Sequence, residues 1–313
     1  MIETSGISKR FKNGKGIFDL SFRVNEGEVF GFIGPNGAGK STTIRHLMGF
    51  LRPDRGTARI GDCDCWSESE KIGDRIGYLP GEIVFPAGLA ARDFLDLQAV
   101  IHRGKGKTRE KALLDRFSLN IDVPVKNMSK GMKQKLAIVA AFMGDPDVII
   151  LDEPGTGLDP LMQKELIDLL AEEKKRGKTI FLSSHIFEEI ETVSDVICII
   201  KDGRIIKHQT IDAIFGELKK YLVVRLRNDS HLPAPWERMA QESGDPEALK
   251  CNPEALRRSP EGCLSYRIPL DDSNVNEIIR ELAEHDICAL TVEQKRLRDV
   301  FEAYYQGGDG DGV

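Results

Sequence analysis

The chain lacks the sequence signs of a membrane span and of secretion. No apolar run reaches the roughly 18 residues that a transmembrane helix needs. The opening residues, MIETSGISKRF, contain no apolar core like that of a signal peptide. Basic residues are not in excess, because 44 Lys and Arg stand against 50 Asp and Glu, for a net charge of −6. We therefore expect a protein that stays in the cytosol and has no nucleic-acid partner.

The cysteines show no pattern typical of a metal site. All six lie outside any C-x-x-C pair and have no clustered histidine partner, so a zinc site is not expected. Cys63 and Cys65 are interpreted as reduced thiols in a loop. The rest of the composition, 41% hydrophobic and 30% charged among 313 residues, is that of a globular protein of about two domains.

The most specific motif is GPNGAGKST at residues 34–42, which follows the apolar run EVFGFI and matches the P-loop pattern G-x-x-x-x-G-K-[ST]. Glycines let the backbone approach a phosphate closely, and the following helix points its positive end at the same group. We expect Lys40 to reach the β- and γ-phosphates of a nucleoside triphosphate and Ser41 to ligate Mg²⁺. A glycine-rich turn without a ligand is the alternative. The other expected nucleotide-binding residues of the loop are Gly34, Pro35, Asn36, Gly37, Ala38, Gly39 and Thr42.

A second group of chemically active residues lies in DVIILDEPGTGLDP at 147–160. Its apolar run predicts a buried strand that brings Asp152 and Glu153 to the carboxyl edge of a sheet, where ligands of open α/β sheets bind. Asp152 is expected to hold Mg²⁺. Glu153 is expected to polarise an attacking water, from the opposite face if the chain is still extended. The alternative is that both carboxylates only cap the end of a strand; the upstream P-loop favours the first interpretation.

Strands and helices alternate along the chain, which predicts an α/β fold. Between about residues 87 and 145 the pattern is helical only, which predicts a helical insertion subdomain. Residues 1–218 form the expected nucleotide-binding domain. Residues 219–305 read as β-α-β-α and predict a small α+β C-terminal domain, and the Gly/Asp-rich tail 306–313 is expected to be disordered. The strands are predicted in the runs SFRVNE, EVFGFIG, DVIILDE, KTIFLSS and DVICIIKDG.

Further motifs occur in the order typical of ATP-binding cassette (ABC) ATPases, a family of P-loop NTPases that the sequence resembles over about residues 1–215. The D-loop matches GLD at 157–159, and the signature region matches MSKGM at 128–132. The other matches are the aromatic Phe11, the Q-loop region IGYLPGE at 76–82 and the switch histidine, His185, in FLSSHIFEEIE.

The resemblance implies roles for these residues. Phe11 would stack on the adenine of ATP, and Ser129 and the Gly131 backbone would bind the γ-phosphate of ATP held on a second cassette. Asp159 of the D-loop would belong to the same nucleotide site. His185 would contact the γ-phosphate, so that Lys40, Glu153 and His185 form the expected catalytic set.

The sequence departs from the family pattern at two motifs. Lys130 and Met132 replace one glycine of the signature pair and its glutamine. Gly81 occupies the Q-loop glutamine position, and Glu82 follows it. A carboxylate is a good ligand for a hard cation, so Glu82 is a candidate third metal ligand beside Ser41 and Asp152. These variants resemble the drug and bacitracin exporter branch of bacterial ABC ATPases.

The resemblance implies an ATP-hydrolysing subunit of a multi-subunit exporter that uses ATP and Mg²⁺. Two copies would meet head to tail around ATP, and hydrolysis would open this dimer. Separate transmembrane permease subunits would hold the protein at the cytoplasmic face of the membrane. The alternative is a soluble ABC ATPase of translation or DNA repair. Those types usually carry two cassettes or a long coiled coil, and neither feature is found in this sequence.

Overall fold

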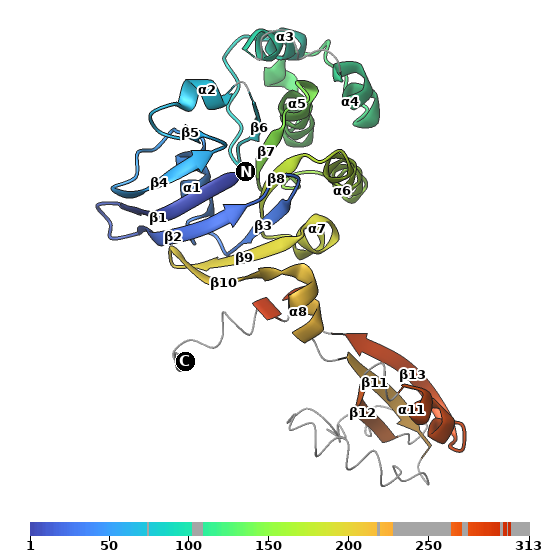
Figure 1. Ribbon diagram of the computed structural model, residues 1–313. Helices are drawn as coiled ribbons and strands as arrows, with labels where there is room; N and C mark the ends of the chain where they lie inside the picture. Colours follow the sequence, from blue (N-terminus) through green and yellow to red (C-terminus); the bar gives the residue numbers. More distant parts are fainter. Residues whose placement is uncertain are drawn as a thin grey trace. The chain divides into compact units, whose positions relative to one another are not determined.

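The computed structural model describes residues 1–73, 75–101, 109–217, 220–227, 264–270, 275–294, 297–298 and 300–301. Contacts divide the chain into two compact units, Met1–Asp212 and Ala213–Val313 (Figure 1). This division falls near the start of α8 (Ile211–Glu217), whereas the sequence-based boundary at 218 lies just after that helix. The predicted disordered tail, 306–313, lies outside the described residues.

A mostly parallel sheet in the first unit carries the P-loop, the Asp152–Glu153 pair and His185 at the ends of its strands. Among the described residues it has six strands in the order β10-β9-β3-β8-β7-β6, of which only β10 is antiparallel to its neighbour. Residues of β3 and β7 are buried throughout, as expected for parallel strands covered on both faces. The strands are β3 (Val29–Ile33), β6 (Ile76–Leu79), β7 (Val148–Asp152), β8 (Thr179–Ser184), β9 (Val196–Lys201) and β10 (Arg204–Thr210).

Helices follow the strands in the α/β alternation that the sequence predicts. These are α1 (Lys40–Leu47) after β3, α6 (Pro160–Lys175) after β7, and α7 (Phe187–Val193) after β8. The carboxyl ends of β3, β7 and β8 meet at one edge of the sheet, so the P-loop, the Asp152–Glu153 pair and His185 come together there.

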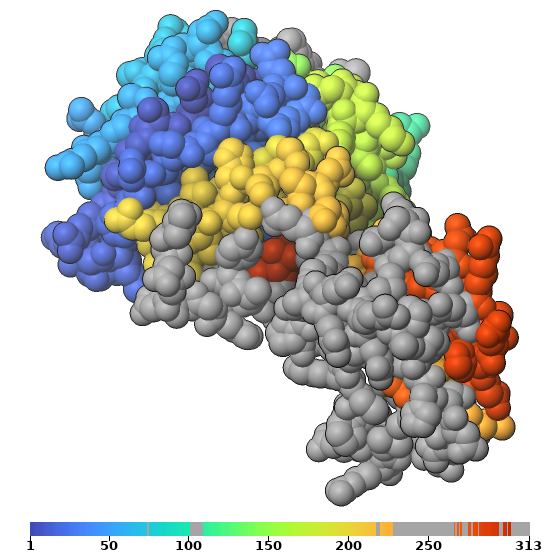
Figure 2. Space-filling view, turned by 60° about the horizontal axis from the view of Figure 1, so that its bottom comes forward, coloured from blue at the N-terminus to red at the C-terminus, as the bar shows by residue number. Residues whose placement is uncertain are grey.

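An antiparallel sheet packs against the first one. In the described part of the chain it contains β1 (Ile2–Arg10), β2 (Gly16–Val24), β4 (Arg55–Ile60) and β5 (Cys63–Asp64) in the order β2-β1-β4-β5. The short helix α2 (Ser69–Gly73) follows. Phe18 N of β2 donates to Gly203 O at 2.8 Å, and in Figure 2 the blue segment of β1 and β2 adjoins the yellow segment of β9 and β10. Cys63 and Cys65 are free cysteines.

Four phenylalanine rings fill the space between the two sheets. Phe30 and Phe32 project from the same face of β3, because side chains two residues apart in a strand share a face. The Phe22 and Phe30 ring centroids are 5.2 Å apart, and those of Phe32 and Phe181 are 5.3 Å apart. Burial of each ring contributes roughly 1.5–3 kcal/mol. This packing fixes β3, and so the start of the P-loop, against the body of the domain.

Helices lie where the sequence predicts a helical insertion. It contains α3 (Ala91–Ile101), α4 (Glu110–Arg116), a 3₁₀ turn (Val125–Asn127) and α5 (Lys130–Met143). Helix α5 packs on β6, at the edge of the sheet where these helices gather in Figure 1. The N-terminus of α5 carries the signature residues, so the insertion presents them at its own surface.

The second unit contains an antiparallel sheet with one helix packed against it. Among its described residues the sheet has the order β12-β11-β13, formed by β11 (Lys220–Leu226), β12 (Leu264–Leu270) and β13 (Ile287–Gln294). Helix α11 (Val275–Leu282) buries Ile278 and Leu282 against Leu222, Val224 and Ile268. The last predicted helix, in LRDVFEAYY, lies mostly outside the described residues. Within the part of the chain that the structure describes, no helix has the length and apolar character of a membrane span.

Candidate nucleotide site

The P-loop joins β3 to α1 through a backbone that only glycine adopts easily. Gly37 and Gly39 have positive φ angles of 84° and 115°, in the region that side chains with a Cβ rarely occupy. A Cβ at Gly37 would meet no atom within 4 Å, so the loop leaves open space beside its backbone. Lys40 begins α1, is 5% exposed and donates from Nζ to Gly34 O at 2.6 Å. The loop has the concave, backbone-lined form that binds phosphate.

A cavity of about 330 Å³ adjoins the P-loop, a size in the range of small-ligand sites. Phe11 lines this cavity and is 39% exposed, so its ring is accessible for stacking on a base. The residues present therefore fit a nucleotide. The cavity is lined by Phe11, Asn13, Lys15, Gly16, Pro35, Asn36, Gly37, Gly39, Lys40, Ser41, Thr42 and Glu153.

Asp152 is the last residue of β7 and is 3% exposed. Its Oδ1 accepts a hydrogen bond from Ser183 Oγ of β8 at 2.5 Å. A buried carboxylate held in this way, together with the Ser41 hydroxyl at the start of α1, is a donor set suited to Mg²⁺. The sequence analysis missed Ser183; the serines before His185 were the available signal.

Glu153 does not continue the strand. Its φ angle is 54°, so the extended geometry considered for the sequence is wrong, and the left-handed backbone turns the side chain back toward the P-loop. Glu153 Oε1 lies 3.0 Å from Lys40 Nζ. Glu153 Oε2 accepts from the His185 backbone N at 3.3 Å and from His185 Nδ1. Glu153 is thus in direct contact with the other two residues expected to be catalytic, Lys40 and His185.

We call Phe11, the P-loop, Asp152, Glu153 and His185 the phosphate half-site. The signature half-site comprises Ser129, Gly131 and Asp159, which are held by different contacts. Ser129 Oγ accepts from Met132 N at 3.2 Å and caps α5, and Asp159 Oδ1 accepts from Met162 N at 3.1 Å and caps α6. A Cβ at Gly131 would lie 3.1 Å from Gly157 O, so the starts of α5 and α6 are neighbours.

The signature half-site lies outside the cavity beside the P-loop. None of the signature half-site residues is among the described residues that line the cavity beside the P-loop. A hydrogen bond joins α5 to the loop after Glu153, because Gln134 Nε2 of α5 donates to Pro154 O at 2.7 Å. The sequence analysis did not identify Gln134 as a site residue.

The Q-loop segment reaches Asp152 through its glycine. A Cβ at Gly81 would lie 3.1 Å from Asp152 Oδ2, so the position that carries glutamine in the family adjoins the expected metal ligand. Glu82, one residue later, is exposed. Nearby, burial and the Asp152 charge raise the pKa of Tyr78 to about 12, so its phenol stays protonated at neutral pH.

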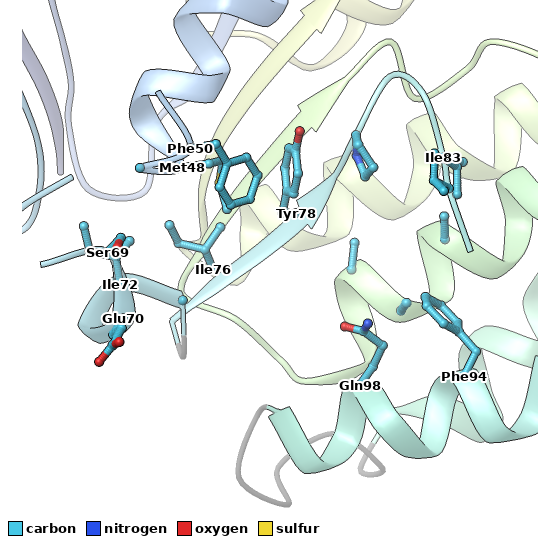
Figure 3. Close-up of a pocket in the computed structure, with 17 residues that line it drawn as sticks. Met48, Phe50, Ser69, Glu70, Ile72, Ile76, Tyr78, Ile83, Phe94 and Gln98 are labelled. Carbon is cyan, nitrogen blue, oxygen red and sulfur yellow. The ribbon is translucent and has the colours of Figure 1, made fainter. Parts of the chain in front are cut away.

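A second, largely apolar cavity of about 530 Å³ lies between the end of α1, β6, the Q-loop segment and the helical insertion. Phe50 and Tyr78 line one side, and Phe94 and Gln98 of α3 line the other (Figure 3). The Phe50 side chain is 63% exposed. The lining of this groove includes exposed Val84 and Pro80, the residue before Gly81.

Comparison with known proteins agrees with this geometry. A family model described as ABC transporter matches residues 17–156. The bacitracin transport ATP-binding protein BcrA of Bacillus licheniformis is 36% identical over 235 residues, which cover 74% of this chain and 76% of that protein. The Nod factor export ATP-binding protein I of Burkholderia pseudomallei is 33% identical over 309 residues, which cover 91% of this chain and 98% of that protein.

A solved ATP-binding subunit of an ABC transporter has the same fold. Its TM-score is 0.65 at 34% identity, over 69% of this chain and 92% of that structure. The resemblance to the drug and bacitracin exporter branch, drawn from the Q-loop and signature variants, is confirmed by these relatives. The chain therefore belongs to the ATP-binding proteins of ABC transporters.

Proposed function

We propose that this chain is a Mg²⁺-dependent ATPase that powers an exporter through closure of a head-to-tail dimer. The division of the site into two half-sites carries this proposal. The phosphate half-site has a cavity, a P-loop lysine and a carboxylate, whereas Ser129 and Gly131 lie outside that cavity. A second copy would supply its signature half-site to the nucleotide held by the first.

Three side chains would carry out the chemistry. Lys40 now pairs with Glu153 at 3.0 Å and would exchange that partner for the β- and γ-phosphates of ATP. The released Glu153 carboxylate would accept the proton of the attacking water. His185, which contacts Glu153 Oε2, would hold that carboxylate in place. Mg²⁺, when bound by Ser41 and Asp152, neutralises phosphate charge. Glu82 is a candidate further ligand for the ion.

The apolar groove beside the Q-loop is the proposed docking site for a permease. Its occupant would be an amphipathic helix on the cytoplasmic side of that membrane subunit, because the groove is apolar and includes strongly exposed Phe50 and Val84. Contact there would reach Asp152 through Gly81. The protein would then lie at the cytoplasmic face of the membrane. The BcrA and Nod factor relatives support export over a role in translation or DNA repair.

Mixing two inactive variants tests the composite site. Lys40→Ala removes the phosphate grip of one half-site, and Gly131→Asp places a negative charge against the γ-phosphate in the other. Each homodimer is expected to be nearly inactive, whereas a mixed dimer rebuilds one site from two intact halves and regains ATPase activity. ATP-dependent heterodimer formation is measured in parallel, because strict coupling between sites would suppress turnover alone. A mixture that neither hydrolyses ATP nor dimerises, beside a wild-type protein that hydrolyses ATP as a monomer, contradicts the proposal.

A further inference from the structure

A buried carboxyl group lies behind the catalytic residues. Glu189 of α7 is 1% exposed, and its Oε2 accepts a hydrogen bond from Ser184 Oγ at 2.6 Å. Ser184 Oγ in turn accepts from Ile186 N at 3.0 Å. The turn that carries His185 is therefore closed by Ser184 and anchored to Glu189.

The other oxygen of Glu189 abuts a glycine of a different loop. A Cβ at Gly155 would lie 1.7 Å from Glu189 Oε1 and 2.9 Å from its Cδ. The carboxyl group thus occupies the space that a side chain at position 155 would need. The backbone angle of Gly155 is not in the left-handed region, so this close approach is what requires glycine there.

Gly155 belongs to the loop that joins the two half-sites. It lies two residues after Glu153, and its carbonyl accepts from Leu158 N at 3.2 Å and from Gln163 Nε2 at 3.3 Å. Position 155 therefore sets the path of the chain from the catalytic carboxylate to the D-loop. Glu189 touches this loop with one oxygen and the His185 turn with the other.

The burial of Glu189 is costly for folding. Desolvation raises the pKa of Glu189 to about 7; the Ser184 hydrogen bond opposes this, and the nearby charges of Glu153 and Glu188 add to it, while His185 lowers it. No hydrogen-bond partner is present for Oε1 among the described residues. A buried carboxyl with one unsatisfied oxygen destabilises a fold, so stability does not account for its place in the structure.

We propose that Glu189 is a positioning residue for hydrolysis, which holds the His185 turn and the Gly155 loop in register so that His185 stays in contact with Glu153. This inference rests on the proposed ATPase function. The carboxyl is assigned a role in turnover, because its contacts are to the turn that carries His185 and to the Gly155 loop.

Five variants of the full chain test this role by steady-state ATPase kinetics, ATP binding and thermal unfolding. Glu189→Ala removes the anchor and is expected to lower kcat about tenfold or more while KM for ATP changes little. Glu189→Gln keeps the shape and an acceptor for Ser184, so most activity should return. Glu188→Ala, which removes the exposed neighbouring carboxylate, is the matched control and should retain wild-type kinetics.

The fourth and fifth variants test the contact between Gly155 and Glu189 itself. Gly155→Ala pushes a methyl group into the Glu189 carboxyl and should also lower kcat, whereas Gly155→Ala combined with Glu189→Ala should be no worse than Glu189→Ala alone, because neighbouring changes are not additive. If Glu189→Ala fails to fold, Gly155→Ala and Glu189→Gln decide the question.

A folded Glu189→Ala protein with wild-type kcat, or additive losses in the double variant, would overturn the positioning role alone. A wild-type protein without ATPase activity would instead refute the proposed function, and the inference with it.

Discussion

The two half-sites differ in how far one chain completes them. In the phosphate half-site the functional side chains contact one another, since Glu153 touches both Lys40 and His185. In the signature half-site, Ser129 and Asp159 each cap the helix that follows them. Under the proposed function, one half would hold a nucleotide within a single chain, whereas the other would meet a nucleotide brought by a partner. Binding and turnover should accordingly be separable properties of this protein.

The largest expected effect comes from the phosphate half-site. Glu153→Gln keeps the shape of the side chain but removes the proton acceptor, so hydrolysis should fall by about 10²-fold or more. ATP binding should persist, and an ATP-bound dimer should accumulate because closure is no longer followed by hydrolysis. ATPase assays and size-exclusion chromatography with ATP measure both effects. Only monomer in the presence of ATP would contradict this prediction.

Two substitutions of one serine test the signature half-site. Ser129→Ala removes the cap of α5, which costs about 1 kcal/mol of stability, and also removes the hydroxyl proposed to meet the partner's ATP. Ser129→Asp keeps a capping oxygen but places a negative charge at the same point. We expect both variants to bind ATP as monomers and to lose ATP-dependent dimerisation. The effect should be larger in Ser129→Asp, whose ATPase activity should fall about tenfold or more.

Equal dimerisation of wild type and Ser129→Asp would show that the N-terminus of α5 does not face a nucleotide. Thermal unfolding separates the two contributions of the hydroxyl, because only Ser129→Ala should lower the melting temperature through loss of the cap.

A third prediction concerns the stability of the region between the half-sites. Because folding raises the pKa of Glu189 from 4.5 to about 7, the folded state binds more protons than the unfolded state between these values. Stability should therefore fall as pH rises from 4.5 to 7, with a slope from this group on the order of 1 kcal/mol per pH unit. Glu189→Gln should flatten this part of the profile. Urea unfolding across that range measures it, and an unchanged slope in the variant would contradict the assignment.

The smallest expected effect is at the Q-loop. If Glu82 takes the place of the missing glutamine, Glu82→Ala should weaken Mg²⁺-dependent hydrolysis or its stimulation by the permease, by less than about tenfold. Gly81→Gln restores the family residue beside Asp152, at the cost of a tight contact of 3.1 Å, and should make Glu82 dispensable. A full Mg²⁺ titration identical in wild type and Glu82→Ala would leave Glu82 without this role.

The sequence predicted the parts of the site that depend on local patterns. The P-loop spacing located Lys40 at a helix start, and continuous apolar runs located β3, β7, β8 and β9, because strands buried on both faces carry no polar interruption. Strand β1 was missed, since Gly6 at φ 60° interrupts it and its register shifts. Strand β6 was also missed, because it has only four residues.

Contacts between distant segments were not predictable in the same way. The left-handed backbone of Glu153 leaves no sign in a run that reads as a strand ending in two acids. The bond from Ser183 to Asp152 joins adjacent strands that lie far apart in the sequence. Glu189 was one glutamate of an ordinary helical pattern, and its burial against Gly155 and its hydrogen bond from Ser184 distinguish it from Glu188. The chemistry of the motifs was predicted from the sequence, whereas the side chains that hold the motifs in place were not.

The Lys40–Glu153 ion pair has a consequence for selectivity among anions. The lysine side chain is 6% exposed and that of Glu153 is 17% exposed, so each charge is neutralised within the protein. An anion that enters the P-loop competes with an attached carboxylate for the same ammonium group. Chloride or a monoanionic phosphate ester should therefore bind weakly, whereas a polyphosphate should carry enough charge to displace the carboxylate. We therefore expect the Glu153 carboxylate to act as a competing anion that disfavours binding of weakly charged solutes.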